Sequence, residues 1–562
     1  MLPGLPPLVH LETVTLGSDT SAVTLPASGT IAGHANFPAG SKHVVCIWQT
    51  RSTTATTSDQ GTNVTVNGDT GAKYDLQRLD GAGSSPAAFS EQGTTSWSNL
   101  AAHTGDNQDA GFFSPTSLLI PHAFGTDNFT GAISVNGIGE QRTRFGMGQW
   151  EDTAAITSVT ITPSSDNWKA GSKFSLYVVD EEYLVSSGEQ IIAESAAAFN
   201  DVSVPSQNGD ISIISYLRSS NTGANEALMI DLNADATNSN YRRQYMYGAG
   251  GSGGGAAAVS TSDRQIGGTV AKGADTNHFS PALISVSAFN SGDNDPHVLS
   301  LGGNRSVSAL DGIVIAGSVS RNNVAAVTSV NLTANTSPST WEIGSGMWVY
   351  AVPKSTISRT ELSSAADSHT FDLTSLTIPA NTHSLRVHVY ARSDRDEGGH
   401  GTTPSDGVEF YLNGDTTGSN YLRQQLVGRG GATSAATGTG TTFMRIPAIG
   451  ATANEFGSAT LLFPYYANTA YHQQILTFGG SETHADLGVR LMSFLWENTA
   501  ALTSIRVDSG SGDFVDGSIF ELEAIIGPVL GWSGTVMGVA NPAKVMGVEK
   551  ANIGKVMGVE SA

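Results

Sequence analysis

The chain is poor in cysteine, in charged residues and in long apolar runs. Its 562 residues include one cysteine, Cys46, so an intrachain disulfide and a thiolate-rich zinc site are both excluded. Only 14% of the residues are charged, against roughly 25% in an average globular domain. No stretch approaches the roughly 20 apolar residues of a membrane-spanning helix, so we expect no membrane insertion.

Basic residues are scarce as well. The chain has 28 Lys and Arg against 50 Asp and Glu, which gives a net charge of −22. Nucleic-acid binders take most of their affinity from basic side chains that neutralise phosphates, so no nucleic-acid partner is expected. Residues Met1 to Pro7 lack the positive and continuously apolar regions of a secretory signal peptide. The sequence therefore predicts a protein that does not leave its cell by that route.

Glycine and small polar residues are abundant, and they belong to a threefold internal repeat. In every copy an Asn-x-Asp turn leads to a Tyr, with Gln three residues and Gly seven residues after it. These turn residues are Asn67, Asp69 and Tyr74; Asn233, Asp235 and Tyr241; and Asn413, Asp415 and Tyr421. A second motif, Ala-Ala-[Ile/Val/Leu]-Thr-Ser, begins at 154, 325 and 500. We predict three units, at 1–183 with an N-terminal extension, 184–355 and 356–527.

Within a unit the hydrophobic period is two. Leu385 to Arg392 alternates apolar and polar residues and is bounded by Gly, Asn, Asp and Thr clusters, as expected of a β-strand. Asn-Gly after an apolar run predicts a hairpin. Only Glu189 to Phe199 is compatible with two or three helical turns. The sequence thus predicts an all-β protein of three tandem antiparallel, jelly-roll-like β-sandwiches, arranged as spaced modules.

The C-terminal segment, 528–562, differs from the units. Val-Met-Gly-Val occurs in it three times, and such short apolar pieces cannot bury themselves within so short a segment. We therefore predict an attachment or assembly segment, with a frayed exposed terminus as the alternative. The predicted assembly residues are Val545, Met546, Gly547, Val548, Val556, Met557, Gly558 and Val559.

No pattern selects a catalytic or metal centre. Gly250 to Gly254 matches the G-x-S-x-G elbow in letters, but it lies in a glycine-alanine loop instead of between a strand and a helix. His383 and His388 fall on opposite faces of a predicted strand and are interpreted as surface histidines. The acidic segments 293–295 and 394–397 lack the rest of a calcium-loop pattern. The recurring turn residues are interpreted as structural, because Asp there can cap its own backbone. We expect no metal, no cofactor and no enzymatic activity.

Tryptophan side chains are the candidates for ligand stacking. Trp150 and Trp496 occupy the same place before the Ala-Ala pair of their units, which predicts a role in the core. Trp97, Trp168 and Trp341 lie in polar loops and are the candidates for stacking on a sugar ring. Packing inside the fold is the favoured alternative for each of them.

The motifs occur in the same order in every unit. A strand ending in Arg (Arg51, Arg218 or Arg392) precedes the Asn-x-Asp turn, the Tyr-x-x-Gln-x-x-x-Gly-x-Gly stretch, the Ala-Ala-x-Thr-Ser strand and a final Gly-Ser strand. This order resembles a repeat of virion structural proteins of tailed bacteriophages, of the tail fibre, minor tail or receptor-binding type. The Lys-Val-Met-Gly-Val tail resembles short terminal repeats of phage structural proteins. Ala234 and Ala236 depart from the Gly and Thr of the other turns.

The resemblance implies a non-enzymatic component on the virion exterior, made in the bacterial host cytoplasm. The implied function is that of a tail fibre or tail-tip component that acts in host adsorption by binding a surface glycan or protein. Its implied partners are other virion proteins of the tail, baseplate or capsid, and further copies of itself in a trimer. Two alternatives stay open: a capsid decoration or head-fibre protein, and a virion-associated glycan depolymerase with carboxylates roughly 5–10 Å apart in a groove.

Overall fold

A computed structural model describes the chain from residue 5 to residue 526, and three short strand pairs between residues 535 and 560. The description omits residues 57–59, 109–110, 140, 197, 200, 205–209, 224, 250–254, 261–262, 272–276, 288–294, 305–312, 324, 336–338, 353–355, 381, 397–404, 430–431, 452–453 and 482–486. Apart from three short 3₁₀ turns, every element of the described chain is a β-strand. The predicted all-β fold of β-sandwich units is confirmed.

Unit 1 is a sandwich of two antiparallel sheets. The larger sheet has the order β1-β12-β3-β8-β9-β10-β5-β6, and the smaller one has the order β2-β11-β4-β7. The strands are β1 Leu8–Thr15, β2 Val23–Leu25, β3 Val44–Thr50, β4 Gln60–Val66, β5 Tyr74–Ala82, β6 Ser85–Thr94, β7 Trp97–His103, β8 Ser114–Ile120, β9 Thr130–Ile138, β10 Arg142–Trp150, β11 Val159–Pro163 and β12 Lys173–Val179.

Units 2 and 3 repeat this topology. Their larger sheets run β13-β24-β15-β20-β21-β22-β17-β18 and β25-β36-β27-β32-β33-β34-β29-β30. Unit 2 comprises β13 Leu184–Ile191, β14 Val202–Ser203, β15 Asp210–Ser219, β16 Asn225–Leu232, β17 Tyr241–Ala249, β18 Gly255–Ser260, β19 Gln265–Ala271, β20 Ser280–Ser287, β21 His297–Asn304, β22 Ile313–Arg321, β23 Ser329–Ala334 and β24 Gly346–Val352. Unit 3 comprises β25 Thr356–Glu361, β26 Ser368–Asp372, β27 Thr382–Ala391, β28 Ser405–Leu412, β29 Tyr421–Arg429, β30 Ala432–Thr439, β31 Thr442–Pro447, β32 Gly457–Pro464, β33 Gln473–Gly480, β34 Val489–Trp496, β35 Ser504–Ser509 and β36 Ile519–Ile526.

The helical turns predicted between Glu189 and Phe199 are wrong. The first part of this segment belongs to β13, which pairs with β24, and the described remainder is extended or bent. Val185, Ile192 and Phe199 are buried in the core of unit 2. An extended backbone spreads these apolar residues along the sandwich, and that burial outweighs the helical propensity of the alanines between them.

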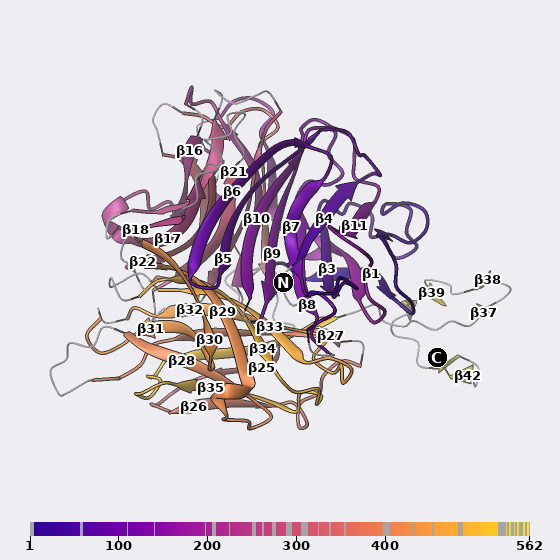
Figure 1. Ribbon diagram of the computed structural model, residues 1–562. Coiled ribbons are helices and arrows are strands. Elements are labelled where there is room, and N and C mark those ends of the chain that lie inside the picture. Colours follow the sequence, from indigo (N-terminus) through magenta and orange to yellow (C-terminus); the bar gives the residue numbers. More distant parts are fainter. Residues whose placement is uncertain are drawn as a thin grey trace.

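The three units are not spaced modules but pack against one another around one common core (Figure 1). Besides its own interior, each unit contributes to a central apolar cluster, including Phe145 of unit 1, Met246 of unit 2, and Leu426 and Leu491 of unit 3. Strand β9 is buried along its whole length, because one face lies in the sandwich and the other faces the neighbouring units. The sequence prediction of separate modules missed this second apolar face.

The repeated Asn-x-Asp turn ties two segments of each unit together. In unit 3, Asn413 Oδ1 accepts hydrogen bonds from Thr503 N (2.7 Å) and Ser504 N (3.2 Å), and its Nδ2 donates to Ala501 O (2.9 Å). The Ala-Ala-x-Thr-Ser motif is therefore the hydrogen-bonding partner of the turn. Asn67 and Asn233 make the corresponding bonds in units 1 and 2.

The Asp and Tyr of the turn are also held within the fold. Tyr421 donates its hydroxyl hydrogen bond to Asp415 O (2.8 Å), and Trp496 Nε1 donates to Asp415 Oδ2 (2.9 Å). Arg321 takes the place of this Trp in unit 2, where its Nε donates to Asp235 Oδ2 (3.2 Å). The departure from the repeat thus preserves the hydrogen bond to the turn carboxylate. Asp69, Tyr74 and Trp150 repeat the unit 3 arrangement in unit 1, and Tyr241 bonds Asp235 in unit 2.

We expect Asn413→Ala to lower the free energy of unfolding by about 2 kcal/mol, because backbone donors near a strand end lose their acceptor. Asn413 also has a φ of +53°, a conformation that alanine adopts at a cost. Urea unfolding followed by tryptophan fluorescence measures the loss. Asn413→Gly relieves only the backbone strain, so equal stability of the Gly variant and the unmodified chain would contradict the role given to the hydrogen bonds.

The two valines of each Val-Met-Gly-Val repeat lie in a pair of short antiparallel strands. The pairs are β37 (Thr535–Val536) with β38 (Val539–Ala540), β39 (Lys544–Val545) with β40 (Val548–Glu549), and β41 (Lys555–Val556) with β42 (Val559–Glu560). Met546, Gly547, Met557 and Gly558 lie outside the described residues, so the assembly role stays a prediction. The described chain has no helix of the length and hydropathy needed to cross a membrane.

Candidate functional site

The three tryptophans predicted to stack on a ligand are buried in the sandwiches. Trp97, Trp168 and Trp341 have no exposed surface, and each indole N–H donates to a backbone carbonyl at 2.9–3.0 Å. Trp168 and Trp341 occupy equivalent positions, which Phe514 fills in unit 3. The stacking prediction is therefore wrong, and the favoured alternative, packing inside the fold, is confirmed. Trp97 begins β7, and Trp168 and Trp341 form isolated bridges that place their rings in the core.

The candidate sites lie instead where one unit meets the next. We name these contacts junction 1–2, junction 2–3 and junction 3–1. In each unit, one position on the strand that comes last in sequence (β12, β24 or β36) faces a junction. The strand register identifies this position. Ser175 pairs with Ile47, Trp348 with Ile214 and Glu521 with His388. Each partner lies four residues before the repeated Arg, so the three positions are equivalent.

Junction 1–2 is filled by an indole. The ring of Trp348 stacks on His122 with centroids 5.3 Å apart and meets His43 edge-on at 4.8 Å. Burial lowers the pKa of both histidines below its ordinary value, so both rings are neutral near pH 7. This junction is an aromatic contact between units.

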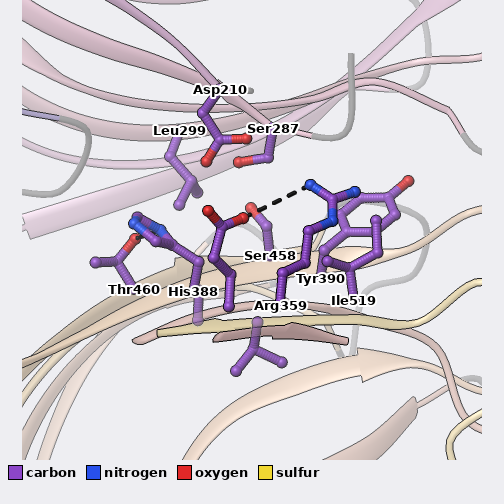
Figure 2. Close-up of a pocket in the computed structure, with 12 residues that line it drawn as sticks. Asp210, Ser287, Leu299, Arg359, His388, Tyr390, Ser458, Thr460 and Ile519 are labelled. Atoms are coloured by element: carbon purple, nitrogen blue, oxygen red, sulfur yellow. Dashed lines mark hydrogen bonds and ion pairs between the residues drawn. The ribbon is translucent and has the colours of Figure 1, made fainter. Parts of the chain in front are cut away.

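Junction 2–3 places a carboxylate at the same position, inside a cluster of buried charges (Figure 2). Burial, together with the neighbouring Asp210 and Glu523, raises the pKa of Glu521 to about 8. Burial also acts on Glu523, but Arg386 and His388 outweigh it and hold its pKa at about 2. Acids with pKa values moved apart are one mark of a catalytic pair.

The space at junction 2–3 is nevertheless too small for a sugar. The cavity beside Asp210 and Glu521 measures about 20 Å³, which is room for about one water molecule. His388, predicted to lie on the surface, is enclosed at this junction and bonds Glu523 (3.0 Å) and Thr460 (3.1 Å) of its own unit. The cluster therefore places the charged groups of unit 3 against Asp210 of unit 2.

Junction 3–1 contains an open groove of about 450 Å³. The small Ser175 stands here where the other junctions have Trp348 and Glu521, and this difference in side-chain size leaves the space unfilled. The groove is lined by β1 and β12 of unit 1 and by the start of β27 and the loop after β32 of unit 3. Its lining residues are Thr13, Thr15, Lys173, Thr382, His383, Tyr465, Ala467, Asn468 and Thr469.

A chain of hydroxyl groups runs along the unit 1 side of the groove. Tyr465 Oη lies 3.0 Å from Ser175 Oγ, which lies 2.7 Å from Thr13 Oγ1, and that oxygen lies 2.7 Å from His10 Nε2. A β-bulge between His10 and Glu12 makes this possible, because the extra residue shifts the alternation of β1. His10 and Thr13 thereby contact each other although they are three residues apart.

The groove carries one cation beside neutral rings. Lys173 Nζ lies 4.9 Å from the centroid of Tyr465 and 5.8 Å from that of Tyr471, and burial lowers its pKa. Burial and the neighbouring His383 lower the pKa of His10 to about 3, and burial followed by Lys173 lowers that of His383. Lys173 has no ion-pair partner among the described residues. At neutral pH the groove therefore offers a single ammonium group.

The groove also holds hydrogen-bonding groups that the described part of the chain leaves unused. Asn468 Nδ2 and Thr382 Oγ1 are buried without a hydrogen-bond partner there. The sequence did not indicate that these residues form a groove, because units 1 and 3 are brought together only by the fold. The one signal in the sequence was that equivalent positions of the three units hold a small, a bulky and a charged residue (Ser175, Trp348 and Glu521). This equivalence becomes visible only once the strand register is known.

Comparisons with known proteins leave the function open. No family model and no curated protein matches the chain. A Ruminococcus gnavus IT-sialidase CBM40 bound to alpha2,3 sialyllactose is 8% identical and covers 30% of this chain and 92% of its own, with a TM-score of 0.15. Alginate lyase Aly36B (9%, 30% and 79%, TM-score 0.17) and a botulinum neurotoxin serotype D/C binding domain (8%, 54% and 83%, TM-score 0.09) are also similar. TM-scores this low do not indicate a shared fold or function.

Proposed function

We propose that the chain is a non-catalytic, glycan-binding structural protein of the exterior of a bacteriophage particle, acting in host adsorption. The observation that carries the binding role is the polar groove of about 450 Å³ at junction 3–1. Its size falls in the range of roughly 300–1,000 Å³ typical of small-ligand sites. The order of the repeat motifs, which resembles that of phage virion proteins, supports the location.

The chemistry of the groove favours a sugar that carries a carboxylate. Threonine hydroxyls and the Asn468 amide supply donors and acceptors of the kind that sugar hydroxyls require. The ammonium group of Lys173 has no described acidic partner, so an anionic ligand gains a charge-assisted hydrogen bond. Tyr465 supplies the rigid wall that fixes this ammonium group. We therefore expect an acidic monosaccharide or disaccharide unit in the groove.

Binding of the full chain to an array of acidic and neutral glycans tests this proposal. We expect acidic glycans to bind, and Lys173→Met to weaken the best of them about tenfold, equivalent to about 1.4 kcal/mol. Lys42→Met is the matched control, because this lysine pairs with Glu189 (2.9 Å) at junction 1–2, which Trp348 fills. Absence of glycan binding, or equal losses in the two variants, would contradict the site.

The location is tested separately, by labelling the C-terminus on intact particles and imaging them. Label at the tail tip or in projecting fibres supports the tail component, and label repeated over the head supports the capsid decoration protein. Label on no part of the particle contradicts the virion role.

The depolymerase alternative has no support at junction 2–3, where the carboxylates face a space of water size. The absence of catalysis nevertheless stays a prediction. Release of reducing ends from a bound acidic glycan would contradict it.

A further inference from the structure

We propose that a divalent transition-metal ion binds between units 1 and 2, held by Asp75, Glu151 and His278. Asp75 lies in β5 and Glu151 directly follows β10, so both belong to unit 1. His278 lies two residues before β20, which begins at Ser280 in unit 2. One ligand atom from each of the three side chains lies within 4.8 Å of the other two.

The imidazole is the part of this cluster that points to a ligand. His278 is 1% exposed, and neither of its ring nitrogens has a hydrogen-bond partner in the described chain. Its Nε2 lies 3.4 Å from Glu151 Oε1, and its ring is held edge-on against Phe129 at 5.2 Å. A buried imidazole normally satisfies its polar atoms, so this ring lacks the partner that a metal ion would supply.

The equivalent positions at the other two junctions are already satisfied. The position of Asp75 is the one directly after the repeated Tyr. The position of His278 in the facing unit is the one directly before a Phe that precedes β20, β32 or β8. At junction 2–3 these positions hold Arg242 and Glu455, which form an ion pair. At junction 3–1 they hold Leu422 and Phe112, which share one apolar cluster. At junction 1–2 the set is two carboxylates and an imidazole, and a cation balances that set.

The ligand types select the class of ion. One imidazole nitrogen with two carboxylates suits Zn²⁺ and its first-row neighbours, whereas Ca²⁺ and Mg²⁺ prefer oxygen ligands alone. Ligand atoms roughly 2.1 Å from a tetrahedral ion stand roughly 3.4 Å apart, so the three groups need to close by about an ångström. Asp75 is anchored for this role, because its Oδ1 accepts a hydrogen bond from Gly93 N (2.9 Å).

The site is also accessible and mechanically placed to couple the units. The Glu151 side chain is 33% exposed, which leaves a side open for ion entry and a water ligand. Phe129 N of unit 1 donates to Asn277 O of unit 2 (3.1 Å), next to His278. A bound ion would reinforce this contact and stabilise the packing of unit 2 on unit 1.

Zn²⁺ alone, added to the untagged full chain after dialysis against a chelator, tests the proposal. We expect one Zn²⁺ per chain by elemental analysis, and a rise in the unfolding temperature that the chelator reverses. His278→Ala and Asp75→Asn should each weaken Zn²⁺ binding at least tenfold. His34→Ala, which removes a half-buried histidine elsewhere in unit 1, should leave it unchanged.

A double variant keeps the test decisive if single variants fail to fold. Asp75→Leu with His278→Phe copies the apolar pair of junction 3–1, so it should fold with an unfolding temperature that Zn²⁺ does not change. Failure of the unmodified chain to bind Zn²⁺ overturns the proposal. Undiminished binding in the double variant overturns it as well, because the ion then lies elsewhere.

Discussion

Asp80→Asn is expected to destabilise the protein by about 3–5 kcal/mol, because it removes the only charge that compensates a deeply buried guanidinium among the described residues. Asp80 Oδ1 and Oδ2 lie 2.8 and 2.9 Å from Nε and Nη2 of Arg144, and both side chains are 2% exposed. Arg78 and Arg142 approach the same carboxylate at 3.5 Å. One carboxylate thus faces three cations inside unit 1.

The measurement is urea unfolding at neutral pH, with Asp508→Asn as the matched control. Asp508 also pairs with an arginine, Arg506, but that side chain is 41% exposed. Solvent screening limits an exposed pair to about 1 kcal/mol or less. Losses of similar size in the two variants would show that burial does not decide the effect at Asp80.

The second expected result concerns Glu521→Gln. Between pH 6 and pH 8.5 the free energy of unfolding of this variant should rise by about 2–3 kcal/mol relative to that of the unmodified chain. Glu521 has a folded-state pKa of about 8, against 4.5 for an ordinary glutamate, chiefly because it is buried and because Asp210 and Glu523 lie beside it. Each unit of pKa shift corresponds to about 1.4 kcal/mol.

The sign follows from proton binding. Between pH 4.5 and 8 the folded protein keeps the Glu521 proton that the unfolded chain releases, so stability falls as pH rises through this window. Glutamine carries no charge at any pH and removes this loss. Buried His10 and His103, whose pKa values burial lowers to about 3, act oppositely below pH 6.5, because only the unfolded chain then binds their protons. Maximal stability is therefore expected near pH 6.5–7.

Glu523→Gln is the control for this pH dependence. Burial acts on Glu523, but Arg386 and His388 overcome it and hold its pKa at about 2, so it is ionised throughout the range tested. Its removal should destabilise the protein at both pH values, since Arg386 loses its partner at 2.6 Å, and less at pH 8.5 than at pH 6, because Glu521 loses a neighbouring negative charge. Parallel stability profiles for Glu521→Gln and the unmodified chain would contradict the raised pKa of Glu521.

Strand periodicity and the repeat were readable from the sequence because both are local. Alternation in Leu385 to Arg392 correctly predicted a strand, and the recurring Asn and Asp marked turns that bond the Ala-Ala-x-Thr-Ser motif. The same alternation suggested that Arg386 and His388 face solvent. They are instead enclosed between units, because the polar face of this strand meets Asp210 of unit 2 and the Leu5 carbonyl of unit 1.

The sequence by itself determined that the protein is all β, that one sandwich topology recurs three times and that each turn is closed by the same Asn, Asp and Tyr, since these depend on spacing within a unit. Only the tertiary structure decided which side chains meet between units. Ser175, Trp348 and Glu521 occupy one repeat position, yet they produce a groove, an aromatic contact and a buried carboxylate. The contacts that distinguish them, with Tyr465, His122 and Asp210, come from residues more than a hundred positions away, and packing of the units around the common core brings those residues together.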